Sequence, residues 1–156
     1  MILVECDNDE ALVRGLGFPR RGIEHHASKG RVLKALEKAP AGTVALVDED
    51  PGAGVPGYFR QFQLAEHLPA LRLRLYRHRS EPKWIVELLP DLEPWLIAAA
   101  GTGGVALTAF HLPDTARALH LNPKANARRL REWASTMLDG GSRHFVKLRE
   151  WFTLAV

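Results

Sequence analysis

Residues 43–48 read Thr43-Val44-Ala45-Leu46-Val47-Asp48, a continuous apolar run that ends in a carboxylate. Such runs are typical of parallel strands that helices cover on both faces. A second run, Met1-Ile2-Leu3-Val4-Glu5, has the same form. The carboxyl ends of parallel strands meet at one edge of a sheet, where open α/β folds hold their sites. The two runs therefore predict an α/β fold that brings Glu5 close to Asp48 and Asp50.

The rest of the chain predicts strands and helices in alternation, followed by helices alone. Further strands are expected at about residues 22–27, 71–75 and 84–89, the last of them a strand or a loop. Helices are expected at about residues 8–15, 28–38, 58–67, 92–100, 114–120, 122–138 and 143–154. This order predicts a mostly parallel sheet flanked by helices. Residues 1–104 would form that domain, and residues 105–156 an all-helical C-terminal extension packed on it.

The composition is that of an ordinary globular chain, with 46% hydrophobic and 25% charged residues among 156. No stretch reaches the roughly 20 apolar residues that cross a membrane, so no membrane partner is expected. The single cysteine, Cys6, is typical of a reducing compartment and predicts a cytoplasmic location. After residue 100, Lys and Arg outnumber Asp and Glu by 8 to 4. This basic excess indicates either a polyanionic partner such as nucleic acid or a solvated helical surface.

Three carboxylates at the predicted sheet edge have the chemistry of a metal site. Asp48 and Asp50 lie two residues apart, so that their side chains point the same way in extended backbone. Together with Glu5 they could hold one or two Mg²⁺ ions, which bind carboxylate oxygens and support phosphodiester cleavage. Asp9, one turn into the first predicted helix, would add an outer ligand. The alternative is that Asp9 favours a helix N-terminus and that residues 48–51 form a turn.

The two acidic runs also resemble the motifs of a known family. The run Ile2-Leu3-Val4-Glu5-Cys6-Asp7-Asn8-Asp9 resembles the first motif of the Toprim (topoisomerase–primase) domain, in which a strand ends in Glu and Gly and an Asp follows. Residues 44–50 resemble its second motif, a strand that ends in Asp-x-Asp. The separation of about forty residues also fits the family. The resemblance covers about residues 1–100 and is closest to the OLD-family nuclease domain and related stand-alone Toprim nucleases.

This resemblance implies a metal-dependent nuclease that hydrolyses DNA or RNA with Mg²⁺ or Mn²⁺. Glu5 would be a metal ligand or the general base, and Asp48 and Asp50 would be ligands. Residues 89–96 are similar to a later acidic segment of these nucleases and make Glu93 a further ligand. Members often act in phage defence beside a separate ATPase, so the resemblance implies such a partner for this chain.

Two further residues follow from the resemblance. Lys83 is the candidate for a lysine that can lie near the active site in this family. Cys6 stands where the family usually has Gly, which allows close approach of the backbone. A cysteine side chain there could crowd the metal ions or alter the turn. The oligomeric state stays open, and a homo-oligomer is compatible with the sequence.

Basic side chains in three segments are candidates for contact with nucleic acid: Lys29 and Arg31, Arg72 and Arg74, and Arg128 and Arg131. The alternative for each pair is a solvated, charged surface. Residues 115–132 also resemble a helix-turn-helix, in which an Arg-rich helix would enter the major groove of DNA. The alternative function is therefore a helix-turn-helix regulator, or a non-catalytic module that binds nucleic acid or supports an assembly.

Overall fold

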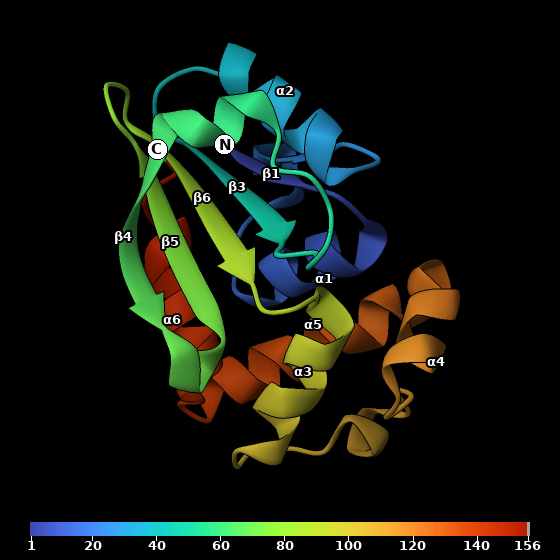
Figure 1. Cartoon of the computed structure of the whole chain (residues 1–156). Coiled ribbons are helices and arrows are strands. Elements are labelled where there is room, and N and C mark those ends of the chain that lie inside the picture. Colours follow the sequence, from blue (N-terminus) through green and yellow to red (C-terminus); the bar gives the residue numbers. More distant parts are fainter. Residues whose placement is uncertain (156) are drawn as a thin grey trace.

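A six-stranded sheet forms the centre of the computed structural model, which describes residues 1–155 (Figure 1). In chain order the strands are β1 (Ile2–Val4), β2 (Ile23–His25), β3 (Thr43–Asp48), β4 (Phe62–Leu68), β5 (Leu73–His78) and β6 (Lys83–Leu88). Their order across the sheet is β2-β1-β3-β6-β5-β4. The first four in this order are parallel, and β5 and β4 follow in antiparallel pairing. The predicted α/β fold with a mostly parallel sheet is confirmed.

Helices cover both faces of this sheet (Figure 1). They are α1 (Asp7–Gly15), α2 (Lys29–Lys38), α3 (Leu92–Gly101), α4 (Ala116–Leu121), α5 (Pro123–Asp139) and α6 (Arg143–Phe152). Buried side chains of α1, α3, α5 and α6 share one large hydrophobic cluster with one face of the sheet. On the other face, α2 and the 3₁₀ helix Gly57–Gln61 pack in a second cluster. No helix within residues 1–155 is long and apolar enough to cross a membrane.

The continuous apolar run of β3 follows from its place in the middle of the sheet. Val44 and Leu46 point into the large cluster, and Ala45 and Val47 point into the smaller one. Because successive side chains of a strand alternate between faces, a strand covered on both faces needs apolar residues throughout. β1 and β6 flank β3 as parallel neighbours, so three carboxyl ends lie at one edge of the sheet.

The helix predicted at residues 58–67 is wrong. The chain there forms a short 3₁₀ helix and then strand β4, which pairs with β5 at the edge of the sheet. Beyond Phe62 the side chains of β4 are mostly exposed, so the strand carries little of the alternation that marks a half-buried strand. Its strand conformation comes from pairing with β5, which a local pattern does not contain.

The other expected elements lie within a few residues of those observed, with one displacement. The strand expected at residues 71–75 begins at Leu73, because Leu71 ends a 3₁₀ helix and Arg72 turns the chain with a φ of 52°. Residues 84–89, expected as a strand or a loop, contain most of β6, which pairs with β3 in the interior of the sheet.

The helices after residue 105 share their core with the rest of the chain. Leu130 and Trp133 of α5 and Phe145 of α6 are fully buried. They lie in the same hydrophobic cluster as Leu12 of α1 and Trp95 of α3. The C-terminal helices therefore complete one face of the sheet.

Replacing Gly15 by Ala tests the close contact between α1 and α5. A Cβ atom at Gly15 would lie 2.7 Å from Ala134 Cβ and from the Arg131 carbonyl oxygen, which belongs to the backbone of α5. We expect Gly15→Ala to lower the free energy of unfolding by about 1–3 kcal/mol, as overpacking does. Gly30→Ala in α2 meets nothing within 4 Å and should instead stabilise by about 0.5–1 kcal/mol. Urea unfolding measures the free energy of unfolding of both variants. An equal change in Gly15→Ala and Gly30→Ala would contradict the close contact between α1 and α5.

Candidate active site

The carboxyl ends of three neighbouring strands place acidic side chains at one edge of the sheet. Glu5 directly follows β1, and Asp48 is the last residue of β3. The backbone N–H of Asp48 donates a hydrogen bond to Glu5 Oε1 at 3.4 Å, so these two predicted site residues are in contact. β6 ends at Leu88, opposite Asp48, and the chain then enters α3, whose N-cap is Asp91.

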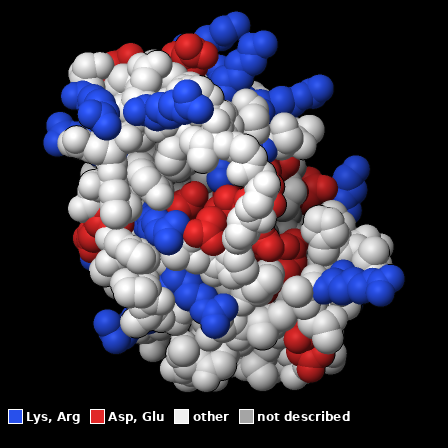
Figure 2. All heavy atoms as spheres, viewed as in Figure 1, with Lys and Arg blue, Asp and Glu red and all other residues white. Residues whose placement is uncertain are grey.

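These strand ends open into a cavity of about 430 Å³. Five carboxylates line it: Glu5, Asp48, Asp50, Asp91 and Glu93. The other lining residues come from the helices α2, α3 and α4: Lys29, Pro94, Ala116, Arg117 and His120. Figure 2 shows Asp and Glu atoms gathered in the middle of this face, with Lys and Arg atoms around them. The structure therefore brings the predicted Glu5, Asp48 and Asp50 together with Glu93.

Burial and the repulsion of neighbouring carboxylates raise the pKa values of three of the lining residues: Glu5, Asp48 and Asp91. Burial raises the pKa of Asp48 to about 9, and neighbouring negative charges, those of Asp9 and Glu5 first, add to the rise. Burial is also the main cause of the raised pKa of Glu5 and of Asp91, and Asp50 contributes to both. A cation among these groups would lower their pKa values, because it favours the ionised forms. The oxygen donors fit a hard divalent ion such as Mg²⁺.

Within residues 1–155, no group of three or more Asp, Glu, His or Cys side chains is arranged to hold a metal ion as it stands. Repulsion between like charges favours rotamers that keep the carboxylates apart. Binding of a cation would therefore require the side chains of Glu5 and Asp48 to turn toward a common point in the cavity. The donor chemistry fits such an ion, and the ligand geometry would form on binding.

Lys29 supplies a fixed positive charge at the edge of the cavity. Its Nζ donates hydrogen bonds to the carbonyl oxygens of Asp48 at 2.6 Å and Glu49 at 2.9 Å. It also lies 3.7 Å from Oε1 of Glu87, a buried carboxylate on β6. These contacts hold the end of β3 and keep the ammonium group beside Asp48. Contact of Lys29 with nucleic acid stays a prediction, for which its place in the cavity is suitable.

Asp9 caps α1 and does not line the cavity, unlike the outer metal ligand predicted from the sequence. Its side chain is buried, and Oδ2 accepts hydrogen bonds from the backbone N–H groups of Glu5 at 3.2 Å and Cys6 at 3.0 Å. The N–H of Asp9 donates to Cys6 Sγ at 3.5 Å, which completes a capping box. Asp9 thus fixes the backbone of Glu5, and the Cys6 sulfur is engaged at the start of α1.

Lys83 lies at the wrong end of β6 for the predicted catalytic role. Its register partner is Thr43 at the start of β3, whereas Asp48 is the last residue of that strand. Five residues of strand, about 16 Å, separate the two ends. Lys83 is buried, donates to the Glu37 carbonyl oxygen at 3.1 Å and forms an ion pair with Glu81 at 2.7 Å. Lys83 therefore lies at the amino ends of β3 and β6, whereas the cavity lies at their carboxyl ends.

None of the other five basic candidates lines the cavity. Arg74 forms ion pairs with Glu49 at 2.7 Å and with Glu87 at 3.3 Å, so its charge is already balanced within the chain. Arg31 lies in the first turn of α2 and Arg72 directly precedes β5, and both are exposed. Their contact with nucleic acid stays a prediction.

The connection between α4 and α5 is shorter than that of a helix-turn-helix. α4 ends at Leu121 and α5 begins at Pro123, so that only Asn122 separates them. A helix-turn-helix uses a turn of three or four residues. Arg128 and Arg131 of α5 line a groove against α1. This arrangement gives no support to the helix-turn-helix alternative.

The sequence prediction misses three lining residues with polar or charged side chains: Asp91, Arg117 and His120. Asp91 follows the end of a strand, as the predicted acidic residues do, and a firm strand assignment for β6 would have found it. Arg117 and His120 reach the cavity because α4 packs beside α3, which no local pattern indicates. His120 Nδ1 lies 3.4 Å from Glu93 Oε1, so α4 contacts the acidic group directly.

Metal-free protein should lose stability as the pH rises from about 4 to about 9. The pKa of Asp48 is about 9 in the folded chain, against about 3.9 in an unfolded chain. The folded state therefore binds more protons in this interval, and the free energy of unfolding falls as the pH increases. Asp48→Asn should make the free energy of unfolding depend less on pH. Part of the dependence should remain in this variant, because the pKa of Asp9 is also raised, to about 7. Urea unfolding in EDTA at acidic, neutral and mildly alkaline pH measures how the free energy of unfolding changes with pH. Equal pH dependence in the wild type and Asp48→Asn would contradict the raised pKa of Asp48.

Comparisons of the chain with family models, with curated proteins and with solved structures gave no match. The resemblance to the Toprim domain therefore rests on residues 2–9 and 44–50 and on the later acidic segment at residues 89–96. The site itself is described by the geometry and charge of its own side chains.

Proposed function

We propose that the chain is a metal-dependent nuclease that hydrolyses phosphodiester bonds of DNA or RNA with Mg²⁺ or Mn²⁺. The observation that carries this proposal is the set of five carboxylates that line one cavity, at the ends of β1 and β3 and at the start of α3. Hard divalent cations prefer such oxygen ligands, and carboxylate-bound cations support phosphodiester hydrolysis. The resemblance of residues 2–9 and 44–50 to the Toprim motifs supports the same chemistry.

In this proposal the carboxylates have two roles, binding of the cation and transfer of a proton. Asp48 and Asp50 would hold the cation, Glu5 would be a further ligand or the general base, and Asp91 and Glu93 would complete the shell. A bound cation would lower the pKa of a water molecule and offset charge on the phosphate. As the general base, Glu5 would accept the proton of the attacking water.

Two cationic side chains, Lys29 and Arg117, and the imidazole of His120 line the cavity and suit a phosphate group. An arginine can bind a phosphate through two parallel hydrogen bonds, and a lysine binds it as a point charge. These groups would hold the phosphodiester against the repulsion of the carboxylates and orient it toward the attacking water. A cytoplasmic location, a role in phage defence and a separate ATPase partner, all expected from the sequence, belong to the same proposal.

The test is cleavage of plasmid, duplex DNA, single-stranded DNA and RNA by the purified chain with Mg²⁺, Mn²⁺ or EDTA. We expect cleavage with either cation and none in EDTA, because the carboxylates alone repel a phosphodiester. The substrate that is cut identifies the nucleic acid. Cleavage that persists in EDTA, or a folded chain that cuts nothing with either cation, would contradict the proposal.

A further inference from the structure

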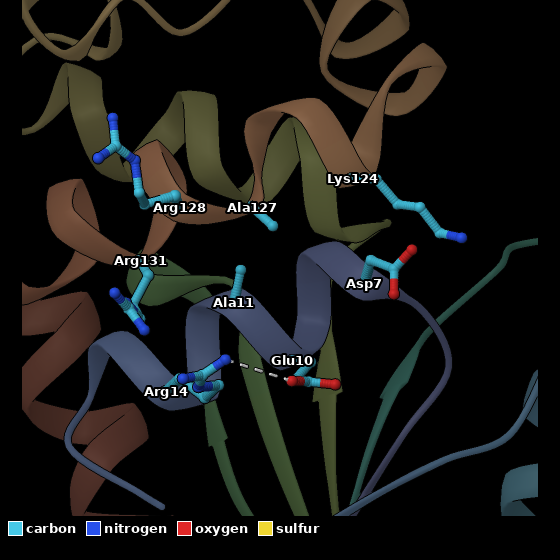
Figure 3. Close-up of a pocket in the computed structure, with 8 residues that line it drawn as sticks. All are labelled: Asp7, Glu10, Ala11, Arg14, Lys124, Ala127, Arg128 and Arg131. Carbon is cyan, nitrogen blue, oxygen red and sulfur yellow. Dashed lines mark ion pairs between the residues drawn. The ribbon is translucent and has the colours of Figure 1, made fainter. Parts of the chain in front are cut away.

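A second hollow, of about 450 Å³, lies between α1 and α5, and we call it the α1–α5 groove. Four cationic and two small side chains line it: Arg14, Lys124, Arg128, Arg131, Ala11 and Ala127. Asp7 and Glu10 complete the lining. Figure 3 shows Ala11 and Ala127 facing one another across the groove, with Arg14 and Arg131 toward one end and Lys124 and Asp7 toward the other.

The cations that α5 contributes form a row along one helix face. Lys124, Arg128 and Arg131 are four and three residues apart, which is the spacing of neighbours on a helix surface. From the first to the last they span about 10 Å of helix. Ala11 and Ala127 leave the space between the helices open, because their side chains end at Cβ. The groove thus presents a line of positive charge and not a single charged point.

These charges are available to an external anion. Within the part of the chain that the structure describes, none of Lys124, Arg128 and Arg131 forms an ion pair. Glu10, by contrast, is engaged with two arginines, one of them Arg14 at 3.7 Å. The free cations outnumber the remaining acidic group of the groove, Asp7, so its net charge is positive.

On two sides, residues of the α1–α5 groove lie close in the chain to residues of the carboxylate cavity. On the α1 side, Asp7 lies two residues from Glu5, so their Cα atoms are within about 7 Å of each other. On the other side, Lys124 follows four residues after His120, which lines the cavity. Asn8 of α1 holds α4 beside α1, because its Nδ2 donates to a carbonyl oxygen of α4 at 3.1 Å. The end of the groove at Asp7 and Lys124 therefore lies close to the cavity.

We propose that the α1–α5 groove binds the phosphate backbone of a nucleic acid strand on one side of the bond to be cut. The relation to the cut bond rests on the proposed nuclease function, whereas binding in the groove does not. A row of cations about 10 Å long matches successive phosphates of one strand, and arginines bind phosphates through paired hydrogen bonds. The substrate of the cavity is then a polynucleotide and not a mononucleotide.

The test is binding of a fluorescein-labelled strand of about 20 nucleotides, longer than common single-strand binding sites, in EDTA. Fluorescence anisotropy over a range of salt concentrations measures DNA and RNA strands separately. Arg128→Ala/Arg131→Ala removes two groove charges, and Arg129→Ala/Arg149→Ala removes two exposed arginines outside the groove. We expect the groove variant to raise the dissociation constant about 100-fold and to lower the salt slope by about 2. The control should change binding less than about threefold.

Equal losses in the groove variant and the control would overturn the proposal, because unspecific charge would then account for binding. Polyglutamate that displaces the strand at equal charge concentration would also overturn it, in favour of an acidic protein partner. Arg128→Ala alone changes only an exposed side chain, so its expected loss of about tenfold does not depend on packing.

The groove proposal and the nuclease proposal can be tested separately, because strand binding is measured without a divalent cation. A chain that binds the strand through the groove but cuts nothing contradicts only the nuclease. A chain that cuts the strand, while the groove variant keeps the wild-type dissociation constant and KM, contradicts only the groove.

Discussion

Asp48→Asn is expected to lower the rate of metal-dependent cleavage by about 10³-fold or more. Asp48 is the last residue of β3 and is in contact with Glu5. It therefore lies among the five carboxylates that line the cavity. An asparagine side chain has nearly the same shape, so the change removes a negative charge and little packing. If Asp48 holds the cation as proposed, loss of that charge would weaken cation binding and change the electrostatic potential at Glu5. The initial rate of strand cleavage with Mg²⁺ or Mn²⁺ measures the effect.

Asp139→Asn is the matched control, because Asp139 is exposed at the end of α5 and the chemical change is the same. It should cleave at the wild-type rate. In EDTA at neutral pH the Asp48 variant should be at least as stable as the wild type, since burial and repulsion disfavour the ionised carboxyl group. A folded Asp48→Asn protein that cleaves within about tenfold of the wild-type rate would contradict the assigned role.

Trp133→Ala should lower the free energy of unfolding by about 3–5 kcal/mol. Trp133 is fully buried, and its ring packs edge-on against Phe145 with 5.3 Å between the ring centroids. Its Nε1 donates a hydrogen bond to the Val105 carbonyl oxygen at 2.7 Å. The alanine variant therefore leaves both a cavity and an acceptor without its donor. Urea unfolding, with the slope compared between variants, measures the loss.

Trp133→Phe is the graded control for this change. A six-membered aromatic ring is kept, but the pyrrole part of the indole and its N–H donor are lost, so the expected cost is about 1–3 kcal/mol. Because α5 shares one hydrophobic cluster with α1 and the sheet, wild type and variants should unfold in a single transition. Two transitions, of which only one responds to Trp133, would show that the C-terminal helices hold a core of their own.

The core of the candidate site is predictable from the sequence for a physical reason. A parallel strand covered on both faces requires an unbroken apolar run, and the first carboxylate after the run marks its end. This places Glu5 and Asp48 at the ends of β1 and β3, which the structure shows to be neighbours. Glu93 could be proposed only through resemblance, because its place depends on the turn between β6 and α3.

The register of β6 could not be predicted, and with it the place of Lys83. Polar Lys83 and Glu87 interrupt the apolar pattern of β6, although both are buried. Which end of the strand meets Asp48 is set by pairing with β3, a long-range contact. The helix prediction for residues 58–67 fails for a related reason, because an edge strand with exposed side chains has no distinctive sequence pattern. The α1–α5 groove likewise exists only because two distant helices pack together.

Titration with Mn²⁺ followed by electron paramagnetic resonance tests most directly whether the carboxylate cavity binds a divalent cation. Mn²⁺ takes the same oxygen ligands as Mg²⁺, and the signal of the free ion falls as it binds. Saturable binding of one or two ions to the wild type is predicted, together with its loss in Glu5→Gln/Asp48→Asn. Wild-type protein that binds no Mn²⁺, or binding that is unchanged in this variant, would contradict the proposed nuclease.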